Sequence, residues 1–167
     1  MLHDVTVADP ALDSAEIEAL LRDVYVGGGF TDSAAAGALF AASAIFERGR
    51  VLVARDRASG AISGMVIVVG PNSPACRFAR EGEREMHLLA VAPPFRRSGL
   101  GGALVSAALD AARSDDAATM ILWTQPEMTS AQRLYERSGF ERVAARDFER
   151  SGRKFLVFER RISARSR

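Results

Sequence analysis

With 167 residues the chain is long enough to bury a hydrophobic core, and we expect one domain over residues 1–160 followed by a frayed tail at 161–167. Its charges nearly cancel to +1, which argues against broad nucleic-acid binding because neutralising phosphates needs a concentrated basic face. No apolar run approaches the roughly 20 residues that cross a bilayer, so we expect no membrane partner. A single cysteine, Cys76, and the lack of a signal-peptide pattern predict a cytoplasmic location.

The chain begins with a pattern typical of one strand followed by two helices. Weak alternation of apolar and polar residues predicts the strand at residues 2–8. Apolar residues at helical spacing predict a helix over 13–25, with Asp13 or Ser14 as its N-cap. The alanine-rich residues 33–46 predict a second, single helix.

The rest of the chain alternates between strand and helix patterns. Residues 50–70 predict two strands joined by a turn, and the proline-containing residues 71–82 predict a loop. A strand over 83–93 then leads into a helix over 99–114. The remaining expected elements, in chain order, are a strand at 119–126, a helix at 129–139, and strands at 140–147 and 153–161.

This order of elements predicts a single-domain α/β (α+β) fold. We expect a mixed, mostly antiparallel sheet of six to seven strands with about four helices. Residues 83–125 form a strand–helix–strand unit, which is expected to be parallel and right-handed.

A glycine cluster before the predicted helix at 99–114 has the composition of an anion site. The sequence "AVAPPFRRSGLGGA" places two arginines ahead of Gly99, Gly101 and Gly102, directly after a strand. Glycines let the backbone approach a ligand closely, and the first N–H groups of a helix have no internal partner. Arg96 and Arg97 add positive charge, so a pyrophosphate suits this segment. Close packing of helix on strand is the competing explanation for the glycines.

Two other phosphate motifs fit this segment poorly. A Walker A loop needs Lys and then Ser or Thr after its final glycine, whereas Gly102 is followed by Ala103. A dinucleotide-binding fingerprint needs a third glycine at the position of Leu104 and an acidic residue at the end of the next strand. That strand ends in Trp-Thr-Gln, so a nucleotide-binding oxidoreductase is a weak alternative.

The segment "LLAVAPPFRRSGLGGAL" resembles the GNAT superfamily of acyl-CoA-dependent N-acetyltransferases. The family pattern is a strand, a turn that often contains proline, Arg or Gln-x-x-Gly-x-Gly or Ala, and a helix. A second family motif, Ala-x-x-Leu-Tyr-x-x-x-Gly-Phe, matches Ala131 to Phe140. The chain departs from the family pattern at Met128, where many members have an asparagine that contacts pantetheine.

The resemblance implies an acetyl-CoA site built from both motifs. The backbones of Leu89, Ala90 and Val91 would pair with pantetheine as an added strand. The N–H groups from Arg97 to Gly102 would bind the pyrophosphate. The residues implied in cofactor binding are Leu89, Ala90, Val91, Arg96, Arg97, Ser98, Gly99, Leu100, Gly101, Gly102, Ala131 and Tyr135.

The expected reaction needs a base and a proton donor. An alkyl amine with a pKa near 10.4 must lose a proton before it attacks a thioester. Glu85 stands where several family members carry their base, and a partly closed cleft is expected to raise its pKa. Glu81 and Glu83 are the alternative candidates for the general base. Glu83, Glu85, His87 and Leu89 are expected on one face of the strand, with His87 either lining the acceptor cleft or serving a structural role.

The family's chemistry implies further roles after attack. A backbone N–H near Val91 would stabilise the oxyanion, and the Tyr135 hydroxyl would protonate the leaving thiolate. Neither a metal site nor a serine hydrolase is supported, because the two histidines are far apart and no G-x-S-x-G occurs.

The function expected from the sequence is acetyl transfer from acetyl-CoA to a primary amine by direct attack in a ternary complex. The acceptor is expected to be a small molecule bound by the first two helices and residues 71–82. A non-catalytic acyl-CoA sensor and a protein N-terminal acetyltransferase remain alternatives, and a homodimer is compatible with the sequence.

Overall fold

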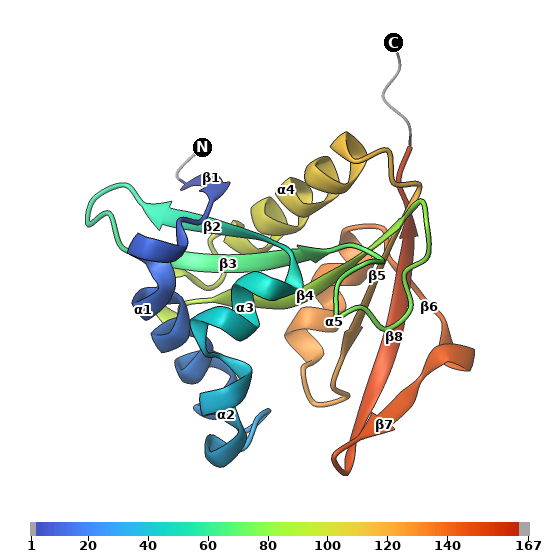
Figure 1. Ribbon diagram of the computed structural model, residues 1–167, viewed down its shortest axis with the longest axis horizontal. Helices are drawn as coiled ribbons and strands as arrows, with labels where there is room; N and C mark the ends of the chain where they lie inside the picture. The colour runs from blue at the N-terminus through green and yellow to red at the C-terminus, as the bar shows by residue number, and fades with distance from the viewer. Residues whose placement is uncertain (1–2, 164–167) are drawn as a thin grey trace.

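The sheet of the computed structural model, which describes residues 3–163, contains eight strands in the order β1-β2-β3-β4-β5-β8-β6, with β7 pairing with β8 (Figure 1). Only β4 and β5 are parallel neighbours; the other pairs are antiparallel. The strands are β1 (His3–Val7), β2 (Arg50–Asp56), β3 (Ile62–Val69), β4 (Glu83–Val91), β5 (Thr119–Thr124), β6 (Glu141–Arg142), β7 (Phe148–Arg150) and β8 (Arg153–Arg161).

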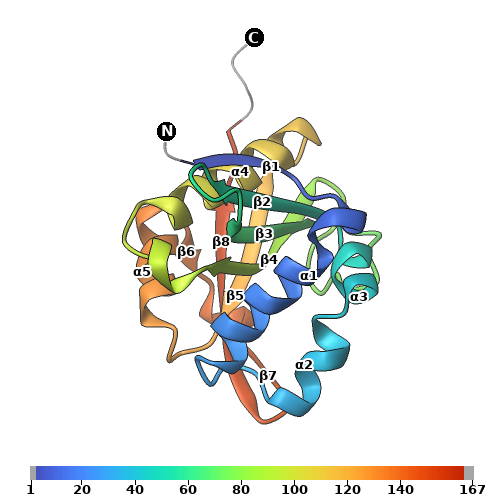
Figure 2. The same cartoon turned by 90° about the vertical axis from the view of Figure 1, so that its left-hand side faces the viewer.

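Five α-helices cover the two faces of this sheet (Figure 2). They are α1 (Pro10–Leu21), α2 (Ser33–Leu39), α3 (Ala42–Arg48), α4 (Leu100–Ser114) and α5 (Thr129–Arg137). The first three lie on one face, and α4 and α5 lie on the other. The expected fold class is confirmed, with one more helix and at least one more strand than predicted. No described helix is long and apolar enough to span a membrane.

Each face of the sheet buries its own apolar cluster. Leu104 of α4 packs with Leu52 and Phe158 on one face. On the other face, Leu21 and the neighbouring helices pack against residues such as Val53. Leu52 and Val53 belong to opposite clusters because successive strand side chains alternate between faces. The central strands therefore hold both helical layers in fixed positions.

The first helices differ from the sequence prediction. Helix α1 begins at Pro10, earlier than predicted. Its N-cap is Asp9, which accepts a bond from Ala11 N at 2.8 Å, and not Asp13 or Ser14. It ends in a π-helical turn, Arg22–Val26. The single helix predicted over residues 33–46 is two helices, α2 and α3. Phe40 leaves helical geometry and is 2 % exposed, so burial of this ring outweighs the helix propensity of its alanine neighbours.

The end of the chain also departs from expectation. The strand predicted over 140–147 is interrupted by a 3-10 turn, Ala144–Arg146, so that β6 and β7 pair separately with β8. The prediction of a frayed tail from residue 161 is wrong for Arg161 and Ile162. Arg161 ends β8, and Ile162 is buried with its N–H donating to Ala118 O at 2.8 Å. Residues 164–167 and Leu2 of the predicted first strand lie outside the described residues.

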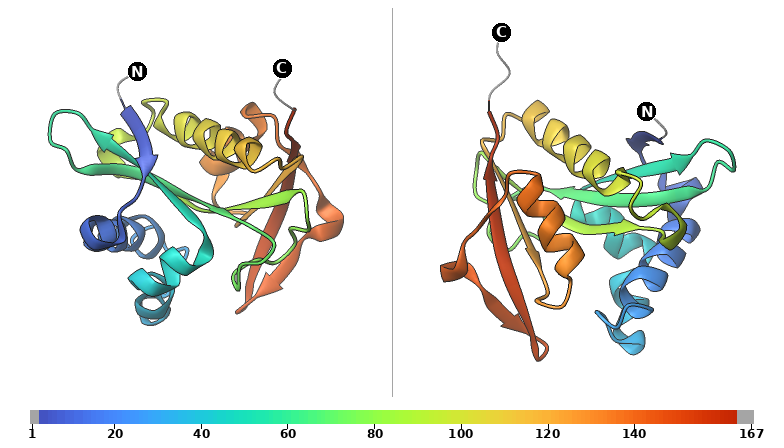
Figure 3. Two further views of the ribbon diagram at one scale, coloured as in Figure 1. Left: turned by 45° about the horizontal axis from the view of Figure 1, so that its top comes forward. Right: turned by 180° about the vertical axis from the view of Figure 1, so that it is seen from behind.

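Strands β4 and β5 separate halfway along their length (Figure 3). Their pairing runs only from Glu83–Thr119 to Met86–Leu122. Beyond that point β4 stays paired with β3 up to Val91, and β5 stays paired with β8 up to Thr124. A bulge accompanies this divergence, because Leu88 and Leu89 together oppose a single residue of β3 and Leu88 has a φ of 51°.

Candidate active site

A cavity of about 550 Å³ lies where β4 and β5 diverge. Its walls come from β4, β5, the segment after α1, α2 and the β7–β8 hairpin. The residues that matter most for its chemistry are Tyr25, Arg48, His87, Leu89, Trp123, Thr124, Tyr135 and Arg150. This lining joins an aromatic surface to several polar groups that converge from separate segments, which is typical of a ligand-binding site.

The bulge in β4 decides which backbone groups reach the cavity. Ala92 N donates to Ser63 O at 2.9 Å, and Ala90 stands opposite Met65 in the β3 ladder. Because backbone groups alternate in direction along a strand, those of Leu89 and Val91 point away from β3, towards the gap. Ala90 faces β3 instead, so the expectation that all three backbones are free for pantetheine does not fit Ala90.

The bulge also corrects the face expected for Leu89. Regular alternation would place Leu89 beside His87, but the extra residue moves it to the cluster that contains Met86 and α4. Glu85 and His87, which precede the bulge, do share a face. The Leu89 carbonyl accepts a bond from the Tyr25 hydroxyl at 2.9 Å, so its N–H is the group left for a ligand.

The glycine cluster forms the loop that was expected before α4. Arg97 and Gly99 both have positive φ values, of 60° and 82°, which turns the chain sharply into the helix. The first backbone bond of α4 runs from Ala103 N to Gly99 O. The N–H groups of Leu100, Gly101 and Gly102 therefore lack partners within the helix and can donate hydrogen bonds to an anion.

The absence of a side chain has a different consequence at each of the three glycines. Gly99 adopts the left-handed conformation, which side chains disfavour. A Cβ at Gly101 would lie 2.9 Å from Leu134 Cδ2, so this glycine allows α4 to pack against α5. A Cβ at Gly102 would meet no atom within 4 Å. Gly102 thus leaves open space beside the free N–H groups, which fits a bound phosphate better than a packing role.

The other predicted cofactor residues surround this loop. Arg96, Arg97 and Ser98 are exposed, and the Ser98 hydroxyl donates to Phe95 O within the turn. Leu100 is buried, so only its backbone is available to a ligand. Ala131 is half-buried at the start of α5, one turn before Tyr135. The structure thus brings the two sequence motifs together, with Gly101 against Leu134, and Tyr135 of the second motif lines the cavity.

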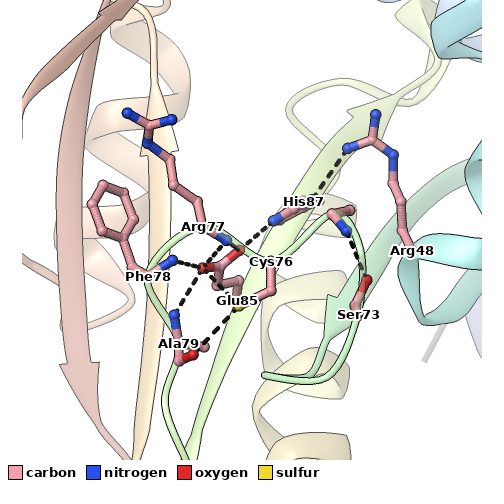
Figure 4. Close-up of polar contacts among 9 residues, drawn as sticks. Arg48, Ser73, Cys76, Arg77, Phe78, Ala79, Glu85 and His87 are labelled. Atoms are coloured by element: carbon pink, nitrogen blue, oxygen red, sulfur yellow. Dashed lines mark hydrogen bonds and ion pairs between the residues drawn. The ribbon is translucent and has the colours of Figure 1, made fainter.

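Glu85 is fully buried and its carboxylate is saturated with donors (Figure 4). Oε1 accepts bonds from Arg77 N at 2.9 Å, Ala79 N at 2.9 Å and Phe78 N. Oε2 accepts a bond from His87 Nε2 at 2.7 Å. Successive backbone N–H groups of the preceding loop thus close around this carboxylate, which anchors the loop to β4.

The predicted rise in the pKa of Glu85 is wrong. Burial by itself raises the pKa, but the bonds from His87 and from the N–H groups of Phe78 and Ala79 outweigh it and lower the pKa to about 2. Glu85 does not line the cavity, whereas His87 does. The carboxylate is therefore ionised at neutral pH, and its oxygens already carry their bonds.

His87 is held between a carboxylate and a guanidinium. Its Nε2 faces Glu85, and its Nδ1 lies 3.3 Å from Arg48 NH1. Because arginine can only donate, Nδ1 must carry the lone pair and Nε2 the proton. Burial lowers the pKa of His87, Glu85 raises it and Arg48 lowers it, with a net reduction. The ring is therefore a neutral imidazole at pH 7.

Aromatic residues fix the position of this ring and border the cavity. Trp123 packs edge-on against His87 with ring centroids 4.7 Å apart. Tyr135 is 6 % exposed, and burial raises its pKa, so its hydroxyl stays protonated at neutral pH. Glu81 and Glu83 do not line the cavity, and the Glu83 carboxylate accepts a bond from Arg80 N at 2.9 Å.

Several cavity residues were missed by the sequence analysis. Tyr25 sits in the π-helical turn, and Arg48 is the last residue of α3, where a basic residue is ordinary. Thr124 is 4 % exposed and its hydroxyl has no hydrogen-bond partner. No local pattern distinguishes these residues, because only the packing of distant segments brings them to the cavity. Within residues 3–163, no cluster of metal-ligating side chains occurs.

The chain belongs to the acetyltransferase (GNAT) family, whose model matches residues 15–140. That match contains the glycine loop, β4 and the motif that begins at Ala131, and it identifies the chain as a member of a family of acyl-CoA-dependent acyltransferases. A comparison with curated proteins finds no match.

Solved structures with the same fold match nearly the whole chain. The PaiA N-acetyltransferase from Thermoplasma acidophilum, solved in complex with coenzyme A, is 11 % identical, with 96 % of this chain and 99 % of that chain covered and a TM-score of 0.76. A GNAT-family acetyltransferase from Staphylococcus aureus is 13 % identical, with 96 % and 99 % covered and a TM-score of 0.75. The ribosomal-protein-S18-alanine N-acetyltransferase from Escherichia coli is 16 % identical, with 98 % and 96 % covered and a TM-score of 0.66. These similarities concern the fold.

The buried Glu85 makes a testable contribution to stability. Its pKa lies below the ordinary value of 4.5, so its contribution is complete above that pH and disappears as the pH falls towards 2. We expect Glu85→Gln to lower the free energy of unfolding at pH 7 by roughly 3 kcal/mol. Urea unfolding between pH 2 and pH 7 measures the difference between the two proteins, which should shrink across the acidic range. The exposed Glu81→Gln is the control, and equal stability of all three proteins at pH 7 would contradict the assigned network.

Proposed function

We propose that the protein transfers an acetyl group from acetyl-CoA to the nitrogen of a small primary amine, by direct attack in a ternary complex. The observation that carries this proposal is a cavity that presents free backbone groups of β4 and a neutral histidine, together with an anion-binding helix start that follows β4 along the chain. Membership of the acetyltransferase (GNAT) family supports acetyl-CoA as the acyl donor.

The donor site is assigned to the gap between β4 and β5 and to the start of α4. The N–H groups of Leu100, Gly101 and Gly102 would bind the pyrophosphate, with Arg96, Arg97 and Ser98 at its exposed edge. Backbone groups of Leu89 and Val91 would pair with the pantetheine arm, and Ala131 would border it. Acetyl-CoA supplies the acetyl group as a thioester, which an uncharged amine can attack.

His87 is proposed as the general base. It lines the cavity, it is neutral at pH 7, and its Nδ1 carries the electron pair of the ring, which faces Arg48 NH1. Glu85 is unsuited to direct proton removal, because a carboxylate with a pKa of about 2 is a very weak base towards an ammonium with a pKa near 10.4. The 2.7 Å bond to Glu85 instead stabilises the imidazolium that forms when Nδ1 takes a proton.

Glu85 is therefore a positioning residue in this proposal, and Tyr135 is the proton donor. Tyr135 lines the same cavity, and its raised pKa keeps the hydroxyl proton available for the thiolate that leaves. The Val91 N–H, which faces the gap, would stabilise the negative charge on the carbonyl oxygen during attack. His87 and Tyr135 border the cavity, whereas Glu85 and Val91 do not line it.

One panel of acceptors distinguishes the proposed function from two alternatives, a protein N-terminal acetyltransferase and a non-catalytic acyl-CoA sensor. Thiol release from acetyl-CoA is followed with small amines, amino acids and peptides with free N-termini. Turnover of peptides alone would favour a protein N-terminal acetyltransferase. Binding of acetyl-CoA without turnover of any acceptor would favour a non-catalytic acyl-CoA sensor.

A substitution at Gly102 distinguishes an effect on coenzyme A binding from an effect on stability. We expect Gly102→Ala to leave the free protein as stable or to stabilise it by about 0.5–1 kcal/mol, since the added Cβ meets open space. The same Cβ would occupy the pyrophosphate site, so the Kd for coenzyme A should rise by at least about tenfold, which corresponds to 1.4 kcal/mol. Isothermal titration calorimetry and urea unfolding measure the two effects. Gly37→Ala, in α2, is the matched control and should leave the Kd unchanged.

The proton-removal step is tested with both histidines. His87→Gln should lower kcat by about 100- to 10,000-fold, the usual contribution of a general base. His3→Gln, which removes the other histidine, should have little effect. Because burial lowers the pKa of His87, the acidic limb of the pH profile of kcat should lie below pH 6.5. Removing Glu85 should shift this limb to lower pH, and an unshifted limb in Glu85→Gln would remove its positioning role.

Tyr135 is tested by a single-atom change. Tyr135→Phe keeps the ring, which packs against Phe140 and Phe158, and deletes only the hydroxyl. We expect a fall in kcat of at least about tenfold with unchanged binding of coenzyme A. The loss should be smaller for an acetyl thioester whose leaving thiol is more acidic. A loss of the same size for both thioesters would exclude protonation of the thiolate by Tyr135.

A further inference from the structure

We propose that the amine acceptor also carries a carboxylate, and that Arg48 and Arg150 bind this carboxylate beside His87. The acceptor class is then amino-acid-like, with the amine and the acid on one small molecule. This inference rests on the acetyl transfer proposed above and names the substrate class for the same cavity.

Arg48 is a half-buried cation without a counter-ion. Its NH1 contacts the Nδ1 of His87 at 3.3 Å, and its Nε is buried with no hydrogen-bond partner. None of the ion pairs formed within residues 3–163 includes Arg48 or Arg150. A buried guanidinium N–H without a partner is costly, and a carboxylate is the ligand whose two oxygens match its fork.

Arg150 adds a second positive charge to the same place. The β7–β8 hairpin carries it to the cavity at His87 and to a neighbouring cavity of about 590 Å³, and Arg48 lines both. Arg77 lies at the second cavity, with its guanidinium 3.7 Å from the centre of the Phe148 ring. Burial lowers the pKa of Arg48, and the charge of Arg150 lowers it further. These like charges repel one another, so an anion between them would be stabilised.

The carboxylates nearby do not neutralise this pair. Asp32 borders the cavity, but it is bonded to Arg153 at 3.3 Å and its side chain is 80 % exposed. Glu47 borders the second cavity and forms no ion pair among the described residues. Glu85 is occupied by His87 and the loop N–H groups. The positive potential at Arg48 and Arg150 is therefore left for a ligand.

The position of Arg48 also limits the distance between the amine and the acid. Arg48 contacts the same nitrogen that is proposed to remove the proton from the amine. A carboxylate bound by Arg48 would therefore lie within a few bonds of the attacking nitrogen. A polyamine would place further positive charge beside these arginines and would be repelled.

The test compares matched acceptors with wild-type protein. Each amino acid of a panel is paired with its own primary amide, which keeps the amine and removes the charge. We expect kcat/KM to be at least about tenfold higher for acids than for amides, since charge-assisted bonds are stronger than neutral ones. Arg48→Gln should lower kcat/KM for the acids to the value for the amides, and Arg150→Gln should lower it part of the way. Arg57→Gln, which removes a surface arginine paired with Asp4, is the control.

The outcomes separate this inference from the proposed function. Equal turnover of acids and amides by wild-type protein would overturn the carboxylate site and leave acetyl transfer intact. Turnover of none of the acceptors would overturn the acetyl transfer itself. If Arg48→Gln does not fold, the wild-type ratio and Arg150→Gln still decide the question. A preference for aminoalkylphosphonates over the amino acids would overturn the choice of carboxylate.

Discussion

The separation of β4 from β5 is the constraint on which the rest of the site depends. Pairing stops after Met86 and Leu122, and the bulge at Leu88 turns β4 so that its next backbone groups face a cavity instead of a neighbouring strand. Leu88 has a φ of 51°, a conformation that costs on the order of 1–3 kcal/mol for a residue with a side chain. The ladder with β3 resumes on both sides of the bulge and holds it in place. Polar backbone groups thus face a cavity in the middle of a sheet; the Leu89 carbonyl is bonded by Tyr25, and a ligand can bond the remaining groups.

Glu85 connects β4 to the loop that precedes it and to His87. A carboxylate at the centre of a sheet would be unfavourable alone, but the bonds from His87 and from the N–H groups of Phe78 and Ala79 lower its pKa to about 2. The same saturation that removes Glu85 as a base makes it a fixed negative charge next to His87. The loop before β4 and the imidazole are therefore held by one side chain. Its loss would disturb stability and chemistry together, so an activity measurement alone cannot assign its role.

The sequence predicted those features that depend on neighbouring residues. The order of strands and helices, the glycine loop and the pairing of the two motifs follow from local patterns and from one family resemblance. The break at Phe40 was missed because alanine-rich stretches favour helix locally, whereas burial of the ring decides the outcome. The bulge was missed because Leu88 and Leu89 are ordinary strand residues. The pKa of Glu85 was predicted in the wrong direction, since it is set by N–H groups of a loop whose path no local pattern specifies.

On the assignments proposed above, Arg48 would join substrate selection to the chemical step. Its contact with Nδ1 occupies the electron pair that His87 needs in order to act as a base, and its charge lowers the pKa of the imidazole. A neutral amine that entered the cavity would leave this contact in place. An acceptor with a carboxylate offers Arg48 a stronger, charge-assisted partner, so binding of that acceptor would release Nδ1 and cancel part of the opposing charge. On the proposed assignments, the acid group of the acceptor would therefore raise kcat as well as lower KM, because the free base forms only when the anion is bound.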